Sequence, residues 1–365
     1  MKFLINTITN WNEPPRTRHF VTLLLSKKHR VVFIAANLTG LPAIGVEQLN
    51  ENLTLITPCF PIDMRIRYRI PVLNEIYQHW LFRKLSMTYS DFEVINFDYT
   101  ATRIFNYFRN VIYYCNDSFY AISKQINPLI IAKYHRRCEA RVAARSKFCV
   151  GISPLIKQEL LRHNANTIEI PLGSPDIEDF DIAVRDVARK NKTINVVLVA
   201  VIKKLNISFN VLNHLLADDT ILLTLIGPVE KDFLEQITNK DRLILKGPAY
   251  GKELYQEINK ADVAIAPYCT KMRNEIFSGT GGKIYHYLAL GKPVVISYMQ
   301  GLSDMNLQDK LIYAAREAAE FPALVHQAHD ENNAVLIRQR ISYAKRNTWS
   351  KRMEDLIAHY ENTNQ

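Results

Sequence analysis

The sequence predicts an α/β protein with two doubly wound, Rossmann-like parallel-sheet domains that face each other across a cleft. Three observations lead to this prediction. The chain has 365 residues, more than one ordinary core needs. Short β-branched and apolar runs alternate with amphipathic helical segments, the pattern of a parallel sheet covered on both faces. This alternation stops at a Gly-Ser-Pro turn and an acidic run at residues 173–181, and then begins again.

In the first domain, placed at residues 1–174, apolar runs predict strands separated by short loops and helices. Helices are expected at residues 17–26 and 127–145. The predicted strands lie at residues 3–6, 30–36, 53–57, 92–96, 111–115, 148–152 and 168–171.

The second domain, placed at residues 175–345, repeats the same alternation. Helices are expected near residues 209–216, 231–237 and 252–260, and the strands at residues 194–200, 221–226, 243–245, 263–266 and 294–296. Residues 334–360 predict one or two further helices, with Trp349 as a packing anchor, and we treat residues 346–365 as a separate C-terminal helical segment.

The composition is that of a soluble globular protein, but the charge calls for an explanation. The formal net charge is +10. Nucleic acid, anionic lipid headgroups and a phosphorylated substrate are all possible partners of a basic protein. The alternative is a soluble basic protein whose charge serves no partner. Five scattered cysteines without a Cys-x-x-Cys pair favour reduced thiols in a cytosolic compartment and argue against zinc. The N-terminal apolar run is short for a signal peptide, and no run reaches the roughly 18 residues of a membrane span.

The most informative stretch covers residues 274–297. Gly279, Gly281 and Gly282 permit positive φ and close backbone approach to a ligand, and Lys283 then opens a helix. Gly291 is a plausible C-cap, followed by a proline and a short β-branched strand. A helix N-terminus preceded by glycines and joined by a lysine is a general anion site, with phosphate the obvious ligand. An ordinary turn with an exposed lysine is the alternative.

This stretch is neither of two better-known phosphate loops. A P-loop needs glycine six residues before the lysine and Ser or Thr after it, where this chain has Phe277 and Ile284. No GxGxxG follows the first strand, so the dinucleotide fingerprint is missing as well.

Residues 58–85 interleave cations with apolar and aromatic side chains. Arg65, Arg67 and Arg69 alternate with Ile and Tyr, and Trp80 precedes a further basic pair. Aromatic rings that insert into the bilayer surface, together with cations that contact lipid headgroups, are typical of a membrane interface. An active-site flap, a nucleic-acid contact and an ordinary solvated face are the alternatives.

These stretches together carry a family resemblance. The second domain resembles the nucleotide-sugar domain of GT-B glycosyltransferases, especially the family-4-like bacterial enzymes and the GumK-type glucuronosyltransferases. Four stretches match in order: Ile221 to Pro228, Leu245 to Tyr250 with Leu254 to Tyr268, Lys283-x-x-His-Tyr-Leu-Ala-x-Gly-Lys-Pro-Val-Val, and Asn347 to Arg352. The first domain matches more loosely, at residues 11–31 and at Val150-Gly-Ile-Ser with Ile170-Pro-Leu-Gly-Ser.

The chain departs from the retaining family-4 pattern at one place. Those enzymes carry two glutamates eight positions apart, where this chain has Ser278 and His286. The GumK-type pattern, a lysine followed three residues later by a glutamine, fits Lys283 and His286 better and leans toward an inverting enzyme.

The resemblance implies the GT-B fold and a metal-independent hexosyl- or glucuronosyltransferase without a cofactor. Such an enzyme moves a sugar from a nucleoside-diphosphate sugar, with UDP-sugar the first choice, to a lipid-linked or polysaccharide acceptor in bacterial surface glycan synthesis. The first domain would bind the acceptor, the second the nucleotide sugar, and residues 346–365 would cross back to the first domain. The expected location is cytoplasmic, on the inner face of the cell membrane with its anionic surface, as for exopolysaccharide or capsule enzymes.

The implied donor site needs positive partners for the diphosphate. Lys283 and the N–H groups after Gly281 and Gly282 come first, and Gly227 ends a neighbouring strand in a glycine turn. Four further residues are candidates that also have ordinary readings: Lys204 with its neighbour Lys203 as solvated loop lysines, His286 as a structural helix histidine, and Glu275 as a loop glutamate.

An inverting enzyme also needs a base, and Asp117 lies just past a buried strand, where GumK-type enzymes place a catalytic Asp. Helix capping is the alternative for Asp117, and Asp98 is a lesser candidate for the base. We expect no metal site, and the acidic run at residues 176–181 is interpreted as a linker. A UDP-sugar 2-epimerase of the same architecture and a basic nucleic-acid-binding protein remain the other functional readings. The first would need more acidic and histidine residues than we find, and the second has no recognition motif.

Overall fold

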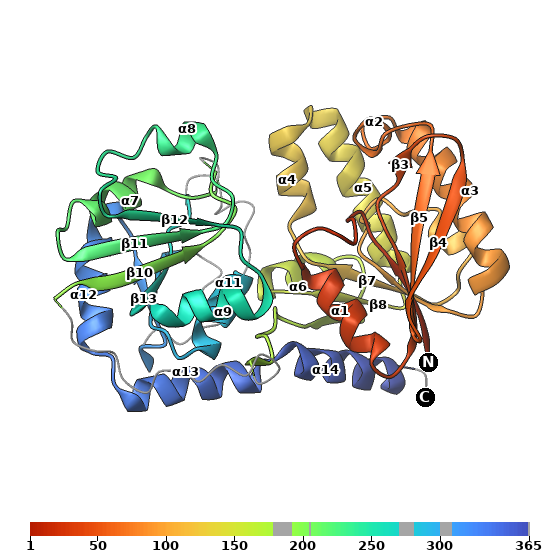
Figure 1. Cartoon of the computed structure of the whole chain (residues 1–365). Coiled ribbons are helices and arrows are strands. Elements are labelled where there is room, and N and C mark those ends of the chain that lie inside the picture. The colour runs from red at the N-terminus through yellow and green to blue at the C-terminus, as the bar shows by residue number, and fades with distance from the viewer. Residues whose placement is uncertain (178–191, 204–205, 270–280, 300–308, 364–365) are drawn as a thin grey trace. The chain divides into compact units, whose positions relative to one another are not determined.

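The computed structural model describes residues 1–177, 192–203, 206–269, 281–299 and 309–363. The chain divides into two compact units (Figure 1). Unit 1 comprises Met1–Pro171 and Met353–Gln365, and unit 2 comprises Leu172–Arg352. The sequence-based boundaries followed residues 174 and 345. The assignment of the acceptor to the first domain and of the nucleotide sugar to the second stays a prediction.

Unit 1 is built on a nine-stranded sheet with the order β3-β5-β2-β1-β6-β7-β8-β9, with β4 paired to β5. All of these pairs are parallel except β4 with β5. The strands are β1 (Lys2–Asn6), β2 (Arg30–Ile34), β3 (Leu38–Thr39), β4 (Ala43–Asn50), β5 (Leu53–Phe60), β6 (Glu93–Asn96), β7 (Val111–Cys115), β8 (Phe148–Gly151) and β9 (Thr167–Glu169).

Helices cover both faces of this sheet, as the buried side chains of β1 show. Phe3 and Ile5 pack in one core cluster with α1, and Leu4 packs in another with α3. This is why the strands are apolar runs rather than alternating ones. The helices are α1 (Thr17–Ser26), α2 (Met64–Arg67), α3 (Pro71–Tyr89), α4 (Phe119–Ile126), α5 (Leu129–Arg145) and α6 (Pro154–Leu161).

Unit 2 has a six-stranded sheet, parallel throughout, with the order β12-β11-β10-β13-β14-β15. Its strands are β10 (Ile194–Val199), β11 (Ile221–Ile226), β12 (Leu243–Gly247), β13 (Val263–Ala266), β14 (Val294–Ser297) and β15 (Ile312–Ala315). Its helices are α7 (Phe209–Leu216), α8 (Lys231–Leu234), α9 (Gly251–Lys260), α11 (Gly282–Ala289), α12 (Phe321–Asp330) and α13 (Ala334–Arg346).

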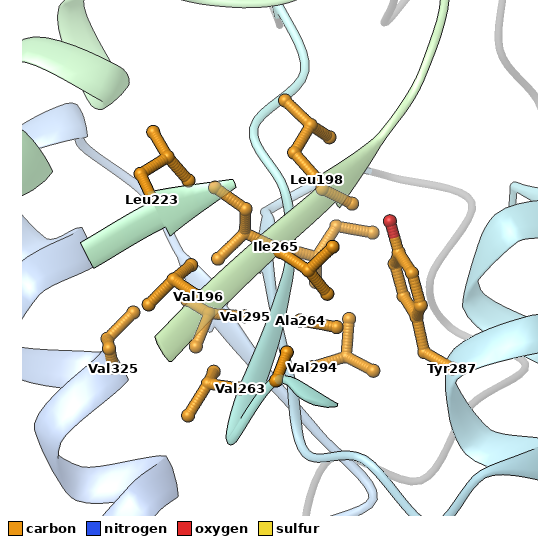
Figure 2. Packing of buried hydrophobic residues seen from close by; sticks show 14 of the residues in the cluster. Val196, Leu198, Leu223, Val263, Ala264, Ile265, Tyr287, Val294, Val295 and Val325 are labelled. Atoms are coloured by element: carbon orange, nitrogen blue, oxygen red, sulfur yellow. The ribbon is translucent and has the colours of Figure 1, made fainter. Parts of the chain in front are cut away.

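Buried aliphatic side chains fill the space between this sheet and its helices (Figure 2). Val196 and Leu198 from β10 pack with Ile265 from β13, and the ring of Tyr287 from α11 closes one side of the cluster. Each of these residues is at most 1% exposed. The α11 helix is therefore fixed to the sheet by its buried face.

The C-terminal residues form two helices, within the alternatives that the sequence predicted. After α13, the helix α14 (Trp349–Asn362) begins in unit 2 and belongs to unit 1 from Met353 onward. Trp349 is a packing anchor as expected, because its side chain is buried. Its main-chain N–H donates to the carbonyl of Ser174 at 2.9 Å. A Cβ on Gly173 would lie 2.7 Å from the Trp349 ring, so the linker backbone passes directly against it.

Each sheet contains one point at which the strand order reverses. In unit 1 the chain runs outward from β1 through β2 to β5 and then resumes at β6 on the other side of β1. In unit 2 it runs from β10 to β12 and resumes at β13, beside β10. In open α/β sheets, ligands bind outside the carboxyl ends of the strands at such points. The loops after β1 and β6, and those after β10 and β13, are therefore the places to look for a site.

Candidate functional site

The loops at the carboxyl edge of the unit 2 sheet are joined by backbone hydrogen bonds. The N–H of Ser208 donates to the carbonyl of Pro267 at 2.8 Å, and the N–H of Cys269 donates to that of Asn206 at 3.2 Å. Ile207 forms an antiparallel bridge with Tyr268. The segments that follow β10 and β13 thus form one connected rim at the reversal point.

Gly227, the residue after β11, lies in the same rim, and its glycine character has a steric cause. Its φ is +128°, and a Cβ there would lie 2.0 Å from the carbonyl oxygen of Ala200. Its N–H donates to the carbonyl of Gly247 at 2.7 Å. Gly227 therefore lets the turns after β10, β11 and β12 pack together, whatever it contributes to a ligand.

The predicted helix after the Gly-rich stretch is confirmed as α11, with Gly281 as its N-cap residue. Glycine has no side chain with which to cap the first N–H groups, and these have no partner within a helix. Gly281 does not use the positive φ that glycine permits, because its φ is −62°. Gly282, too, is not among the described positive-φ glycines.

Gly291 carries the left-handed conformation instead, with a φ of +68°. Its N–H donates to the carbonyl of Leu288 at 2.9 Å, and that of Lys292 donates to the carbonyl of Tyr287 at 3.0 Å. This pair of bonds is a Schellman motif. The prediction that Gly291 ends the helix is therefore confirmed, and a Cβ at this glycine would lie 2.7 Å from Ile337.

Lys283 lies in the first turn of α11, and two contacts hold this helix at the rim. The Lys283 Nζ lies 4.9 Å from the centroid of the buried Tyr268 ring. The Tyr287 hydroxyl accepts a hydrogen bond from the N–H of Val199, the last residue of β10, at 2.9 Å. The cation and the start of a helix are thus brought to the reversal point between β10 and β13.

His286 lies one turn further along, in an environment that favours the structural reading. Its Nδ1 is 2.9 Å from the Tyr255 hydroxyl, and the two rings are stacked with centroids 5.6 Å apart. Burial lowers the pKa of His286 to about 4. The imidazole is therefore neutral near pH 7, so it offers no charge to a phosphate.

The remaining donor-site candidates divide into described and undescribed residues. Lys204 and Glu275 lie outside the described residues. Lys203, the neighbour of Lys204, is exposed and pairs with Glu230 at 3.2 Å. This exposed pair is what an ordinary loop lysine would form.

Sequence analysis missed a second lysine with a clear role. Lys292 is buried, and its Nζ donates to the carbonyls of Asn259 and Ala261, each at 2.8 Å. These carbonyls lie at the C-terminal end of α9, where an ammonium also meets the negative end of the helix dipole. In the sequence, Lys292 lies between a helix-ending glycine and a proline, which indicates only a turn. Its buried contact with the end of α9 could therefore not be predicted from the pattern.

Asp117, the candidate base, lies just beyond the carboxyl end of β7. Ser118, rather than Asp117, is the N-cap residue of α4. The carboxylate Oδ2 accepts a hydrogen bond from the Asn116 side chain at 3.1 Å, and the main-chain carbonyl of Asp117 accepts one from the Phe119 N–H at 3.0 Å.

Asp98, the lesser candidate for the base, has a structural role. It is buried, and its Oδ1 accepts hydrogen bonds from the Thr100 N–H at 2.8 Å and from the Thr100 hydroxyl at 2.7 Å. The half-buried position of Asp117 suits a proton acceptor for a bound substrate better than the satisfied carboxylate of Asp98 does.

The structure corrects the predicted basic surface at Arg67. Residues 64–67 form the short helix α2 rather than an extended segment, so the three arginines do not share one face. Arg67 is 3% exposed, and its guanidinium lies 3.8 Å from the Tyr77 ring centroid. It also donates to the side chains of Asn37 and Asn74. A membrane contact through Arg67 is therefore contradicted by its burial.

Trp80 is also less available than predicted, because its ring packs on the core. The ring centroid lies 5.3 Å from that of Phe60 and 6.1 Å from that of Tyr77. Arg65 and Arg69 are exposed, as a surface role requires. Arg69 donates from Nε to the Asn127 side chain at 3.2 Å and so links the end of α2 to the α4–α5 turn.

Around this link lies an apolar surface that composition alone does not show. We define the apolar patch as seven side chains that are 44% to 75% exposed: Ile66, Ile70, Val72, Ile76, Ile126, Leu129 and Ile130. They belong to α2, the start of α3 and the α4–α5 turn, and Figure 1 shows these elements at one end of unit 1. Exposed cations accompany them: Arg65, Arg69, Lys124, Lys133, Arg136 and Arg137. Among the described helices, none has the length and apolar character to cross a membrane.

Comparison with known proteins connects this architecture to one family. Residues 189–330 match the model of the family described as glycosyl transferases group 1. No curated protein matches the chain.

Solved structures with the same fold cover nearly the whole chain. An alpha,alpha-trehalose-phosphate synthase (UDP-forming) from Burkholderia xenovorans, in complex with glucose-6-phosphate, has a TM-score of 0.72 at 11% identity and covers 100% of this chain and 99% of its own. HepE from Anabaena in complex with UDP has a TM-score of 0.71 at 12% identity and covers 99% of both chains. Sucrose-phosphate synthase from Thermosynechococcus elongatus has a TM-score of 0.72 at 12% identity and covers 99% of this chain and 98% of its own.

These likenesses confirm the predicted α/β fold of GT-B type, with two parallel-sheet domains. The GumK-type resemblance has no counterpart among them. The matched family segment contains β10 to α12, and hence the rim, α11 and Lys283. The segment that matches the glycosyl transferases group 1 model thus lies within the second unit of this chain.

Proposed function

We propose that this protein is a glycosyltransferase that transfers a sugar from a UDP-sugar to a lipid-linked or polysaccharide acceptor in bacterial surface glycan synthesis. The observation that carries the proposal is the position of Lys283. It lies in the first turn of α11, at the reversal point of the sheet, inside the segment that matches the glycosyl transferase family. Two of the structurally similar proteins were solved with UDP or with a sugar phosphate, which supports this class of substrate.

The donor diphosphate would lie against the start of α11. When the bond between the sugar C1 and the diphosphate oxygen breaks, negative charge builds up on the leaving diphosphate. The Lys283 ammonium and the N–H groups of the first helical turn, which opens at Gly281 and Gly282, would stabilise that charge. We keep Lys204 and Glu275 as further donor contacts, for diphosphate and for sugar or ribose respectively. The proposal requires no metal, because these groups supply the positive charge.

The acceptor would react through Asp117. Its carboxylate would take the proton from the acceptor hydroxyl while the oxygen attacks C1 of the donor sugar, with inversion at that carbon. Its half-buried position beyond β7 supports this role. In a retaining reaction no such base is needed, and Asp117 would only position the acceptor.

The apolar patch suits an acceptor that is held in a membrane. Exposed Ile, Val and Leu side chains accompanied by Arg and Lys are the combination with which a protein rests on an anionic bilayer. We therefore propose that unit 1 contacts the inner face of the cell membrane through this patch, from the cytoplasmic side. Arg65 and Arg69 remain in the proposed contact, and Arg67 does not.

The test is the release of UDP and free sugar from a panel of UDP-sugars by the purified protein, with and without EDTA. Slow donor hydrolysis that survives EDTA is expected for a metal-independent glycosyltransferase. In the presence of acceptor, Asp117→Asn should lower kcat about 100-fold or more with little change in donor KM, since general-base catalysis contributes roughly 10²–10⁴-fold. Interconversion of UDP-sugar epimers without UDP release, or no turnover of any donor, would refute the proposal.

A further inference from the structure

Arg18 is a buried arginine whose hydrogen-bonding capacity the described protein leaves unused. The residue is 5% exposed, and its Nε and Nη1 atoms are buried without a hydrogen-bond partner in the described part of the chain. A guanidinium removed from water is costly unless its donors are satisfied. Buried polar groups that stay unsatisfied are rare in folded proteins and call for an explanation.

Two other buried arginines show what a structural guanidinium looks like in this protein. Arg340 is fully buried and donates to the main-chain carbonyls of Leu311, Gly291 and Lys310 and to the side chain of Asn332. Arg67 donates to two asparagine side chains and packs on Tyr77. Both tie segments of the fold together. Arg18 makes no comparable set of bonds, so a structural role does not account for its burial.

The charges around Arg18 leave its burial largely uncompensated. Desolvation is the largest effect on its pKa, and the nearby Arg16 adds to it. Asp117 and Glu13 act in the opposite direction but more weakly, and the pKa of Arg18 falls to about 10. Glu13 is itself paired with Arg16 at 3.4 Å. The guanidinium keeps its charge at neutral pH, in a place where a further anion would stabilise it.

Arg18 also lies where ligands bind in this class of fold. It is the second residue of α1, and helical side chains lean toward the N-terminus of their helix. The first turn of α1 is held by His19, whose Nδ1 accepts from the Arg16 N–H at 3.1 Å and whose Nε2 donates to the Asn10 carbonyl at 3.1 Å. Burial lowers the pKa of His19, which is consistent with this neutral tautomer.

The segments around the guanidinium converge on one edge of the unit 1 sheet. The α1 helix follows β1, at the reversal point between β1 and β6, and Asp117 follows β7 on the same edge. Asn6 and Asn96, the last residues of β1 and β6, are hydrogen-bonded to each other at 2.7 Å directly at this point. A helix N-terminus, an unsatisfied buried guanidinium and the candidate base therefore meet at the carboxyl edge of the sheet.

We propose that Arg18, with the N-terminal turn of α1, binds a phosphoryl group of the substrate within unit 1, beside Asp117. A phosphate monoester or diphosphate offers the planar pairs of acceptor oxygens that match the guanidinium Nε and Nη donors, and it is favoured at a helix N-terminus. The phosphoryl group belongs either to a phosphorylated acceptor or to the nucleotide donor, and only this choice of source rests on the proposed glycosyltransferase activity.

The test is the binding of inorganic phosphate and pyrophosphate to the full chain at fixed ionic strength, measured by calorimetry against a chloride control. The Lys283→Ala protein is used so that the donor site of unit 2 does not contribute. In this background, Arg18→Met should weaken binding at least tenfold, and Arg162→Met, which removes an exposed arginine of unit 1, should leave it unchanged. Unchanged affinity in Arg18→Met would refute the proposal, and so would the absence of any anion binding to the Lys283→Ala protein.

A stability measurement separates a binding residue from a structural one. Arg18→Met should unfold at the same or a higher melting temperature than the wild type without ligand, because it removes a buried, unsatisfied charge. Arg340→Met should unfold at a markedly lower temperature, because it leaves several carbonyls without donors. A large loss of stability in Arg18→Met would show that the residue is structural. If that variant does not fold, Arg18→Lys replaces it, and unchanged phosphate affinity with the single amine would count against the proposal.

Two further ligands identify the source of the phosphoryl group. If it belongs to the acceptor, Arg18→Met should weaken the binding of geranyl phosphate, a soluble isoprenyl monophosphate, and leave UDP affinity unchanged in the protein with native Lys283. If it belongs to the donor, UDP affinity should fall instead. If Arg18→Met loses phosphate binding and the wild type hydrolyses a donor, both proposals are supported. If the wild type hydrolyses no donor, the proposed glycosyltransferase activity alone is overturned.

Discussion

Lys283 and Lys292 belong to the same short sequence pattern, yet their side chains do different work. Lys283 lies half-buried at the start of α11, above the Tyr268 ring. Lys292 is buried and bonds two carbonyls at the end of α9. A pattern match cannot separate the two residues, since it records only their spacing. Their exposure and contacts can.

This difference predicts opposite effects of two substitutions. Lys283→Ala should weaken UDP binding about 10- to 100-fold, the value of one or two charge-assisted contacts, with little effect on stability. Lys292→Met should lower the free energy of unfolding by about 2–3 kcal/mol, because two buried carbonyls lose their donor, and should leave UDP affinity intact. Calorimetric titration and urea denaturation measure the two quantities. If Lys292→Met weakened UDP binding as strongly as Lys283→Ala, the assignment of the two roles would be wrong.

His286 gives the protein a predictable sensitivity to acid. Its pKa is lowered to about 4 in the folded protein, from the ordinary value of 6.5. Between these two pH values the unfolded chain binds the proton and the folded protein does not, so folding stability is full above pH 6.5 and declines as the pH falls toward 4. The contribution is about 3 kcal/mol. His286→Gln should flatten this part of the stability–pH curve in urea denaturation, and an unchanged curve would show that the imidazole is not held neutral.

At the scale of the element, the turns after the parallel strands depend on single glycines for different reasons. Gly227 has positive φ and a neighbouring carbonyl at 2.0 Å from where a Cβ would be. Gly247 has a φ of +70° but nothing within 4 Å of that position. The two residues therefore form a matched pair, in which both substitutions add backbone strain and only one adds a steric clash.

Gly227→Ala should accordingly destabilise the protein by about 3 kcal/mol or more, because the backbone at Ala200, just after β10, would have to move. Gly247→Ala should cost about 1 kcal/mol, the price of the left-handed conformation alone. Chemical denaturation of both variants measures the difference. Equal losses would show that the turns can separate and that close packing is not the reason for Gly227.

The apolar patch is also an element-scale feature, because α2, α3 and the α4–α5 turn build it together. The Ile126→Glu/Ile130→Glu protein should bind vesicles containing anionic lipid at least tenfold more weakly than the wild type, since it places charges among the side chains that would bury. Met87→Glu is the matched control, because Met87 is an exposed apolar residue near the far end of α3. Co-sedimentation measures binding, and equal loss in both variants, or none in either, would contradict membrane contact through this patch.

At the scale of the whole molecule, the fold class could be predicted from the sequence because parallel strands that are buried on both faces consist of continuous apolar runs. It did not reveal β4, whose residues are mostly exposed and which pairs antiparallel to β5 at the edge of the sheet. Such a strand carries neither an apolar run nor a buried alternation, so its pairing depends on its neighbour alone. The short β15 was missed as well, although it is mostly buried.

The site was predicted in part. The sequence located α11, its C-terminal glycine and the turn at Gly227, because glycine and proline mark backbone geometry directly. It misplaced Arg67, because alternating letters do not show which way a helical turn directs each side chain. It gave Arg18 no role, since the unsatisfied burial of a guanidinium arises from the packing of segments that are far apart in the sequence.

The most direct test of the account is the thermal stability of the whole protein with UDP, GDP, ADP, TDP and CMP. A ligand present at 100 times its Kd stabilises the folded state by about 2.7 kcal/mol, which a melting curve resolves. We predict that UDP raises the melting temperature selectively and that Lys283→Ala removes this shift. No shift with any of the five nucleotides, or the same shift with all of them, would contradict a UDP-sugar site at the start of α11.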